Sequence, residues 1–222
     1  MNELPLLTLK RLPQYLELLY KYQREGLLAV SATRLADETG VHMTQVRKDL
    51  SFTGVVGVPK IGHQIAKLIS AIETCLNWHD SSSCMLIGVG RLGSALLGYQ
   101  ELVRKGLSIV AAFDRDPSLA GTVVHETPIY PLSKFADLAQ RLHIHIGIIT
   151  VPAEAAQETA DLMVSSGIIA IWNFTSVKLR VPAEIIVENV DMSASLAVLS
   201  RRLAEKLYVD ENPPSQDTGA NL

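Results

Sequence analysis

The stretch Gly88-Val89-Gly90-Arg91-Leu92-Gly93 decides the fold, because it lies between a predicted strand and a predicted helix. The apolar run 84–87 precedes it, and a helical pattern begins at Ser94. A G-x-G-x-x-G sequence in this context indicates a dinucleotide-binding unit. Its first glycine permits a tight turn, its second lets the backbone approach a pyrophosphate, and its third lets the helix pack on the strand. The helix would offer free N–H groups and its positive dipole end to the phosphates.

A second predicted strand, residues 108–113, ends at Asp114, 21 positions after Gly93. In dinucleotide-binding proteins an acidic residue at about this spacing binds a ribose 2′-hydroxyl. This acid favours NAD as the ligand. The neighbouring Arg115 could bind a ribose 2′-phosphate, so NADP remains an alternative. The plain alternative is a strand–helix turn that binds nothing, and the second strand with its acid counts against that alternative.

From position 84 onward, predicted strands alternate with predicted helices. Helical patterns cover 132–142 and 153–165, and strands are predicted at 144–151, 168–174 and 187–190. Such alternation is typical of an α/β domain with a mostly parallel sheet. Together with the glycine turn, it predicts a Rossmann dinucleotide-binding domain over residues 81–190.

The first 80 residues have helical patterns instead. An amphipathic helix that ends at Gly26 is predicted from apolar residues spaced by three and four: Leu12, Tyr15, Leu16, Leu19 and Tyr22. Ser31 can cap a second helix, and a tight turn at residues 39–41 precedes a third helix over 43–50. This order is the plan of a helix-turn-helix, so we expect a DNA-binding domain over residues 1–80.

The third helix would be the recognition helix, with the polar residues Thr44, Gln45, Arg47 and Lys48. Gln suits adenine edges, Arg suits guanine edges, and Lys and Thr suit phosphates. The glycine-rich segment 51–63 predicts a small hairpin, the wing of a winged helix. Lys60 near its tip would touch the DNA backbone or minor groove. The alternative for the basic residues is an ordinary solvated helix face.

Two further segments complete the predicted organisation. The polar, turn-rich stretch 77–83 is expected to link the two domains. Residues 191–208 form a predicted amphipathic helix, with Leu196, Leu199, Leu203 and Leu207 on one face. That face must be buried either in its own domain or against a partner chain. Residues 209–222 are polar and are expected to be a disordered tail.

Composition limits the class of protein. The chain has 222 residues, 48% of them hydrophobic, which is enough for a sizeable core. Its net charge is −3, and the first 80 residues have nine basic against eight acidic side chains, which counts mildly against a generic polyanion binder. No apolar run is long enough to span a bilayer. Without a signal-peptide pattern, and with Cys75 and Cys84 as the two cysteines, we expect a cytoplasmic protein.

Six stretches together resemble the Rex family of redox-sensing transcriptional repressors, over about residues 11–203. They are Arg11-Leu12-Pro13, Gln45-Val46-Arg47-Lys48-Asp49-Leu50-Ser51, the glycine turn, Phe113-Asp114-Arg115-Asp116-Pro117, Thr150-Val151-Pro152-Ala153-Glu154-Ala155-Ala156 and Val187-Glu188-Asn189-Val190-Asp191. No single stretch is decisive, whereas all six in this order are highly specific.

The resemblance implies a winged helix, a Rossmann domain that binds NADH and NAD⁺, and a homodimer in which the C-terminal helix is swapped. It implies a repressor and not an enzyme, with no catalytic residues and no metal. NADH binding would release a palindromic operator whose half-sites match the two-fold dimer. The regulated genes would be those of NADH reoxidation, fermentation and respiration.

The resemblance also assigns residues. The glycine turn would hold the pyrophosphate, and Asp114 beside Arg115 the adenosine ribose. The dinucleotide cleft would be lined by Thr150, Val151, Pro152, Asn173 and Phe174. Tyr99 and Asp191 would link the nicotinamide site to the domain interface. DNA contacts would come from Arg11, Thr44, Gln45, Arg47, Lys48, Ser51 and Lys60.

Several positions differ from the usual family pattern. The Phe-Gly that follows the recognition helix is Thr53-Gly54 here, and the wing ends Lys60-Ile61-Gly62-His63 in place of Gly-x-Gly-Tyr. A position of the first helix that is often basic in the family is Glu17 here. The position after the Asp of the last motif, commonly aromatic in the family, is Met192 here.

Alternative functions remain at this point. An NAD-dependent oxidoreductase would need an acid/base pair near the nicotinamide. Tyr130 and Lys134 have the spacing of a known pair, but Pro131 leaves Tyr130 outside the helix. A coenzyme A–type nucleotide is a third possibility, although its 3′-phosphate would be repelled by Asp114. His143 and His145 share a strand face without a third metal ligand, and both cysteines are expected to be ordinary small residues.

Overall fold

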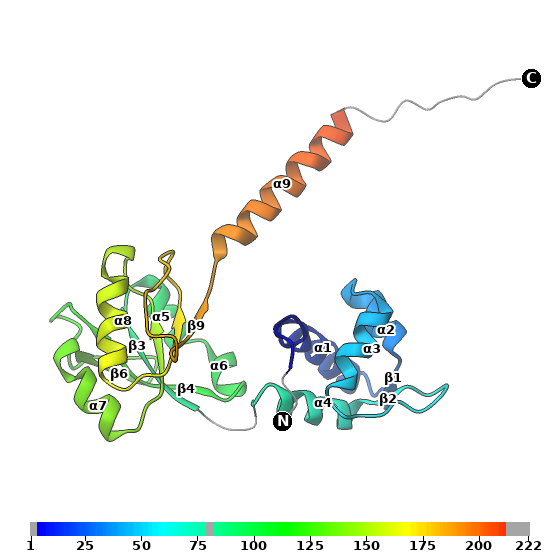
Figure 1. Ribbon diagram of the computed structural model, residues 1–222, viewed down its shortest axis with the longest axis horizontal. Helices are drawn as coiled ribbons and strands as arrows, with labels where there is room; N and C mark the ends of the chain where they lie inside the picture. The colour runs from blue at the N-terminus through cyan, green and yellow to red at the C-terminus, as the bar shows by residue number, and fades with distance from the viewer. Residues whose placement is uncertain (1–3, 79–81, 212–222) are drawn as a thin grey trace, which may run out of the picture. The chain divides into compact units, whose positions relative to one another are not determined.

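The computed structural model describes residues 4–78 and 82–211 (Figure 1). The chain divides into two compact units: unit 1 is Met1–Ser82 with Gln100–Ser108, and unit 2 is Ser83–Tyr99 with Ile109–Leu222. The domain boundary expected at residue 80 therefore omits Gln100–Ser108 from unit 1. Lys105 of that segment lies 3.2 Å (Nζ to Oε1) from Glu17, which explains why the segment groups with the first helix.

Unit 1 contains the expected helix-turn-helix. Its main elements are α1 (Leu6–Arg24), β1 (Ala29–Val30), α2 (Ala32–Thr39), α3 (Met43–Ser51), β2 (His63–Gln64) and α4 (Ile65–Cys75). The side chain of Ser31 caps α2 by accepting from Arg34 N (3.1 Å), as predicted. Gly40 ends α2 in the left-handed region (φ 68°), where glycine has no Cβ penalty, so the chain can turn sharply into α3.

The predicted wing is present between α3 and α4. Val58 and Gly62 exchange two backbone hydrogen bonds of 2.8 Å, so the chain folds back on itself around Lys60. Lys60 has φ 65° at the turn. β2 then pairs antiparallel with β1, which joins the end of the wing to the segment before α2. At Gly62 a Cβ would lie 2.3 Å from Val30 O, so glycine is required for this close approach.

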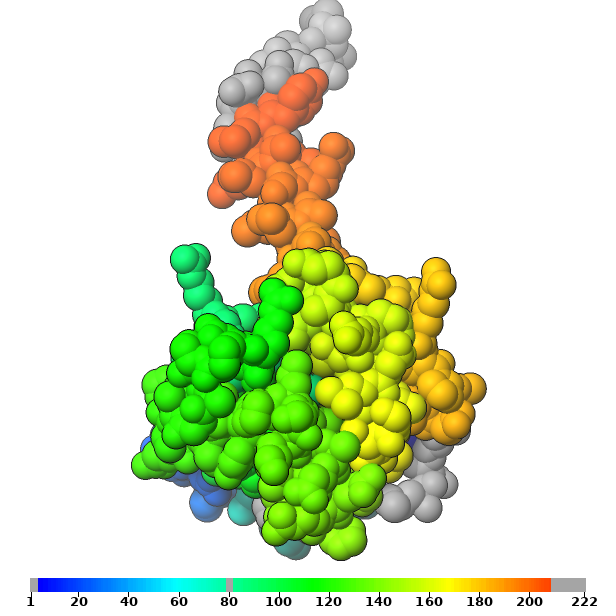
Figure 2. All heavy atoms as spheres, turned by 90° about the vertical axis from the view of Figure 1, so that its left-hand side faces the viewer, coloured from blue at the N-terminus to red at the C-terminus, as the bar shows by residue number. Residues whose placement is uncertain are grey.

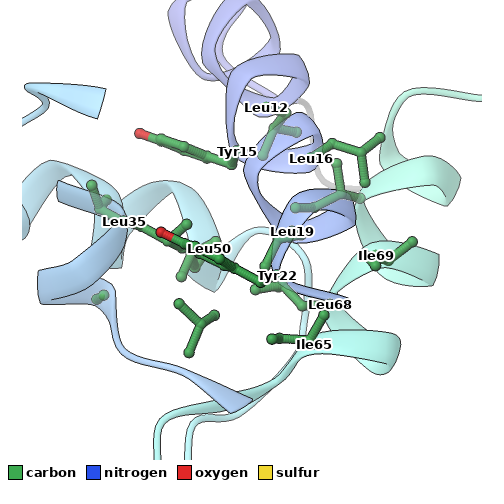
Figure 3. Close-up of a cluster of buried hydrophobic side chains, with 14 of the residues drawn as sticks. Leu12, Tyr15, Leu16, Leu19, Tyr22, Leu35, Leu50, Ile65, Leu68 and Ile69 are labelled. Atoms are coloured by element: carbon green, nitrogen blue, oxygen red, sulfur yellow. The ribbon is translucent and has the colours of Figure 1, made fainter. Parts of the chain in front are cut away.

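The core of unit 1 forms where α1 crosses the other helices (Figure 3). The predicted apolar face of α1 is fully buried: Leu12, Tyr15, Leu16, Leu19 and Tyr22 each have an exposed fraction of 0%. They pack with Leu35, Leu50, Leu68 and Ile72 from α2, α3 and α4. Figure 3 shows the hydroxyl of Tyr15 at the edge of this cluster, pointing away from Leu16.

Unit 2 is built on one sheet of strand order β5-β6-β4-β3-β7-β8-β9. The strands are β3 (Ser82–Ile87), β4 (Leu107–Asp114), β5 (Val123–Val124), β6 (Thr127–Pro131), β7 (Ile146–Ile149), β8 (Ala170–Asn173) and β9 (Ile186–Asn189). The pairs β3–β7, β4–β6, β7–β8 and β8–β9 are parallel, and β5–β6 is antiparallel. The prediction of a mostly parallel α/β sheet is confirmed.

The remaining elements connect these strands. They are α5 (Arg91–Leu97), α6 (Gln100–Arg104), the 3₁₀ turns η1 (Leu132–Lys134) and η2 (Ala153–Ala155), α7 (Phe135–Arg141), α8 (Ala156–Ser165) and α9 (Met192–Glu211). The predicted helices 132–142 and 153–165 each begin as a 3₁₀ turn after a proline. The sequence pattern predicts no strand between 114 and 132 and therefore misses the β5–β6 hairpin, whose turn uses His125 and Glu126 at positive φ.

α7 and α8 pack side by side, and Figure 2 shows the segments that contain them next to each other on one face of unit 2. Strand residues Met85, Ile87 and Phe113 point into this layer, where Phe113 meets Phe135 of α7 edge-on at 5.0 Å between ring centroids. Every side chain described in α9 is exposed, including the predicted stripe Leu196, Leu199, Leu203 and Leu207. The predicted tail 209–222 lies largely outside the described residues. In the described part of the chain, no helix is long and apolar enough to cross a membrane.

Candidate dinucleotide and DNA site

The glycine turn has the geometry that its sequence predicts. Gly88 has φ 104°, a region that only glycine adopts readily. A Cβ at Gly93 would lie 1.9 Å from Gly88 O, so the start of α5 can sit against β3 only without a side chain there. A Cβ at Gly90 would meet no atom within 4 Å. Gly90 therefore borders open space, as expected where a ligand approaches the backbone.

Asp114 stands at the carboxyl end of β4, beside the turn. Its Oδ2 accepts from Val89 N (2.6 Å), and its Oδ1 accepts from Asp116 N (2.9 Å). The acid is thus held by backbone groups on both sides and faces the turn. Val89 and Asp114 are 25 positions apart in the sequence, and they come into direct contact because β3 and β4 are neighbours in the sheet.

Thr150 joins the turn from the other side. Its Oγ1 donates to Gly88 O (2.7 Å). β3 and β7 pair in parallel with Ile87 opposite Ile149, which places Thr150 next to Gly88. Strand order reverses at β3, because β4 lies on one side and β7 on the other. Ligands of open α/β sheets bind at such a reversal, at the carboxyl ends of the strands.

A cleft of about 910 Å³ lies at this point. The predicted residues that line it are Gly88, Gly90, Asp114, Arg115, Thr150, Val151 and Pro152. Val89, Arg91, Leu92 and Gly93 complete the turn without lining the cleft. Sequence reasoning missed Leu132, Ser133, Glu158, Thr159 and Leu162, which also line it. These residues follow β6 or lie on α8, and no motif spacing marks them.

Other predicted cofactor and switch residues do not line this cleft. Asn173 is fully buried and donates to Asn189 Oδ1 and Val177 O (both 2.9 Å), so its amide holds the β8–β9 end together. Phe174 and Asp191 line a second cavity of about 510 Å³. Tyr99 is 54% exposed at the end of the α5 segment.

The predicted DNA contacts fall into two groups. Thr44, Arg47 and Lys48 are exposed on α3, and Lys60 is exposed on the wing. Ser51 is also exposed, and its hydroxyl donates to Lys48 O (2.7 Å) at the end of α3.

Arg11 and Gln45 form the second group, because both donate to the carboxylate of Asp49. This buried carboxylate was not singled out by the sequence. Burial alone would raise its pKa, but hydrogen bonds from Arg11, Gln45, Tyr15 and Thr8 outweigh burial and hold the pKa at about 2.

Two sequence-family models match the chain. Residues 3–51 match a model described as a putative DNA-binding protein N-terminus, and residues 79–177 match one described as a CoA binding domain. Redox-sensing transcriptional repressor Rex from Treponema denticola is 42% identical over 192 residues, or 86% of this chain and 91% of that protein. Rex from Bacteroides fragilis is 41% identical over 91% of this chain and 92% of its own length.

The chain belongs to the Rex family. Solved structures agree across both units. RSP, a Rex-family repressor, in complex with β-NAD⁺ and operator DNA superposes with a TM-score of 0.86 at 31% identity, covering 95% of this chain and 97% of that one. RSP in complex with β-NADH gives 0.85 at 30% identity, covering 95% and 99%.

Three positions that depart from the Rex pattern differ in their surroundings. Thr53 Oγ1 donates to Leu50 O (2.6 Å) and accepts from Val55 N (3.2 Å), so it shapes the exit from α3. The ring of His63 lies under Gly57 of the wing, and burial lowers its pKa. Met192 is 62% exposed and lines the second cavity.

Burial governs the two cysteines of this Rex-family chain. Burial raises the pKa of Cys84 to about 12 and also raises the pKa of Cys75, so both favour the unreactive thiol. Within residues 4–78 and 82–211, no group of three or more His, Cys, Asp or Glu side chains is arranged to hold a metal ion.

Proposed function

We propose that this protein is a transcriptional repressor that senses the NADH/NAD⁺ ratio. It binds a palindromic operator as a homodimer and releases it when NADH occupies unit 2. The observation that carries the proposal is the pairing, in one chain, of a winged helix with a dinucleotide cleft. Relatives at 40–42% identity, matched over 91–92% of their own length, are named redox-sensing repressors.

The cleft fits a dinucleotide. Open space at Gly90 leaves room for a pyrophosphate against the backbone. Asp114 would accept from the adenosine ribose, while Leu132 and Leu162 supply apolar walls. A carboxylate at this position repels a 2′-phosphate, and Glu158 adds a second negative charge to the lining. We therefore propose NAD(H) over NADP(H), with Arg115 beside the ribose.

A coenzyme A–type nucleotide is the second candidate, favoured by the description of the family model that matches residues 79–177. The same two acids, Asp114 and Glu158, disfavour its ribose 3′-phosphate. Displacement of bound NADH by coenzyme A at similar concentration would support this candidate. No displacement is expected.

The chain functions without catalysis in this proposal. NADH and NAD⁺ act as ligands with different affinities for two dimer conformations, since a ligand of equal affinity for both shifts nothing. Tyr99 and Asp191 would connect the nicotinamide end of the cleft to the interface. Hydride transfer to a small aldehyde or alcohol by the purified protein would contradict this view.

The homodimer is supported by the exposed apolar stripe of α9. Four leucines between 53% and 64% exposed would be covered by a second copy of the chain. Leu203→Glu should give a monomer by analytical ultracentrifugation, because it places a charge in that stripe. Arg201→Glu, on the opposite face of α9, should remain dimeric. A dimeric Leu203→Glu variant would contradict the role of α9.

The direct test is a fluorescence-anisotropy titration of a labelled palindromic operator of the Rex type. It is performed at fixed salt, because salt alone changes such affinities by orders of magnitude. We expect tight binding that NADH releases and NAD⁺ does not. Operator affinity that is unchanged by saturating NADH would contradict the proposal.

A further inference from the structure

Asp49 carries a buried charge on the inner face of the recognition helix. Its exposed fraction is 0%, although Asp is almost never fully buried unless it is paired. Val46 and Leu50, on the same side of α3, are apolar core residues. A carboxylate among them would be costly without compensation, so its partners indicate what it does.

Five hydrogen bonds converge on this carboxylate. Four come from α1: Thr8 Oγ1 donates to Oδ1 (2.9 Å), Arg11 donates from Nη2 to Oδ1 (2.8 Å) and from Nε to Oδ2 (2.6 Å), and Tyr15 Oη donates to Oδ2 (2.8 Å). The fifth comes from Gln45 Nε2, one turn earlier on α3, to Oδ1 (2.8 Å). A carboxylate has about four lone-pair sites, so its capacity is filled.

This arrangement fixes α3 on α1. The three donor residues of α1 occupy successive turns along one side of that helix, and Asp49 must meet all of them at once. Apolar packing alone tolerates small shifts between helices, whereas a bidentate arginine–carboxylate pair is directional. The exposed side chains of α3 therefore have a defined position and rotation relative to α1.

The same carboxylate orients Gln45. An ionised carboxylate only accepts hydrogen bonds, so the amide nitrogen of Gln45 must face Asp49. One amide N–H is thereby committed inside the protein. The amide oxygen and the second N–H remain for a base edge, and adenine offers the matching donor and acceptor in the major groove.

We propose that Asp49 is a positioning residue for operator recognition: it locks α3 to α1 and holds the Gln45 amide in the orientation that contacts a base. Arg11, whose Nε and Nη2 both bond Asp49, acts through this carboxylate instead of on the DNA. The inference rests on the proposed operator binding and names the residues that set its sequence preference.

The test is selection of bound duplexes from a randomised library, using the full chain with NAD⁺. We expect the wild type to enrich a palindrome. Gln45→Ala should lose preference at one base pair in each half-site, by about tenfold. Asp49→Asn should lose the same preference, and the double variant should lose no more than either single variant. Lys48→Ala is the control, because losing a phosphate contact lowers affinity for all sequences alike.

Arg11→Lys is the milder companion variant, since it keeps the charge but cannot make the bidentate pair. It should shift the same base preference to a smaller extent, with unchanged circular dichroism and NADH affinity. Wild-type base preferences in both Asp49→Asn and Arg11→Lys would overturn the inference while leaving the proposed function intact. A wild type that binds NADH yet enriches no sequence would overturn both.

Discussion

The dinucleotide turn and the recognition helix are specified in different ways. The geometry of the turn depends on the backbone: Gly88 has φ 104°, and Gly93 has no room for a Cβ. The position of the recognition helix depends on side chains of two helices, which donate hydrogen bonds to Asp49. Glycines at fixed spacing are visible in a sequence. Hydrogen bonds between residues that are separated by 34 and 41 positions cannot be recognised in a sequence.

This difference predicts different responses to mutation. The turn should fail abruptly wherever a Cβ meets backbone, because backbone cannot move aside cheaply. The recognition helix should lose sequence preference by degrees, since each hydrogen bond to Asp49 can be weakened separately.

The largest effect is expected at Gly93. In Gly93→Ala the new Cβ would lie 1.9 Å from Gly88 O, so the turn must open. We expect NADH affinity to fall more than a hundredfold and the thermal midpoint of unit 2 to drop, measured by calorimetry with and without NADH.

Gly90→Ala is the matched control for that change. Its Cβ meets nothing within 4 Å, so the thermal midpoint of the free protein should be unchanged. NADH affinity should still fall, because the methyl group occupies space at the cleft. If both variants unfold at the same lowered temperature, it is wrong that Gly93 is required for packing and Gly90 only for ligand binding.

The next effect concerns the stability of unit 1 against acid. The pKa of Asp49 is about 2 in the folded chain against an ordinary 3.8, so the folded state favours the ionised form. Its stabilisation is therefore complete above pH 4 and is lost as pH falls through 2. Asp49→Asn should cost roughly 3 kcal/mol at neutral pH, the usual cost of breaking a buried pair.

Hydrogen exchange of α1 and α3 peptides measures this difference locally. The free energy of opening of these peptides should differ between wild type and Asp49→Asn by a constant amount from pH 7 to 4, and the difference should become smaller toward pH 2. A gap that does not change with pH would mean that the Asp49 carboxylate is not the source of the stability.

Sequence reasoning recovered what depends on spacing. It predicted the helix-turn-helix, the wing around Lys60, the parallel sheet, and seven residues that line the cleft. It missed the cleft wall from α8, because Glu158 and Leu162 belong to an ordinary helical pattern. It also missed Asp49, whose partners are brought together only by the packing of α1 on α3. The β5–β6 hairpin was not predicted because its turn has no glycine.

A smaller effect is expected at Asp114. Asp114→Asn keeps the shape of the side chain but removes the charge that would repel a 2′-phosphate. NADH affinity should fall about tenfold, as for the loss of one charged hydrogen bond. NADPH affinity, measured by the same fluorescence titration, should fall less. An equal loss for both dinucleotides would argue against Asp114 at the ribose.

The smallest effect is expected at the wing. Lys60 is the basic residue of the 51–63 segment, and Val56 and Ile61 beside it are exposed and apolar. Lys60→Ala should weaken all operators about equally and lower the salt slope of binding by about one. A change in base preference instead would place Lys60 among the specificity residues, against the comparison drawn above.

The coupling of the two units is the central claim, and its most direct measurement is NADH affinity with and without operator. Linkage requires operator to weaken NADH binding by the same factor as NADH weakens operator binding. We predict equal factors, measured by calorimetric titration of the free protein and of its operator complex. An NADH dissociation constant that is identical in both would contradict the account.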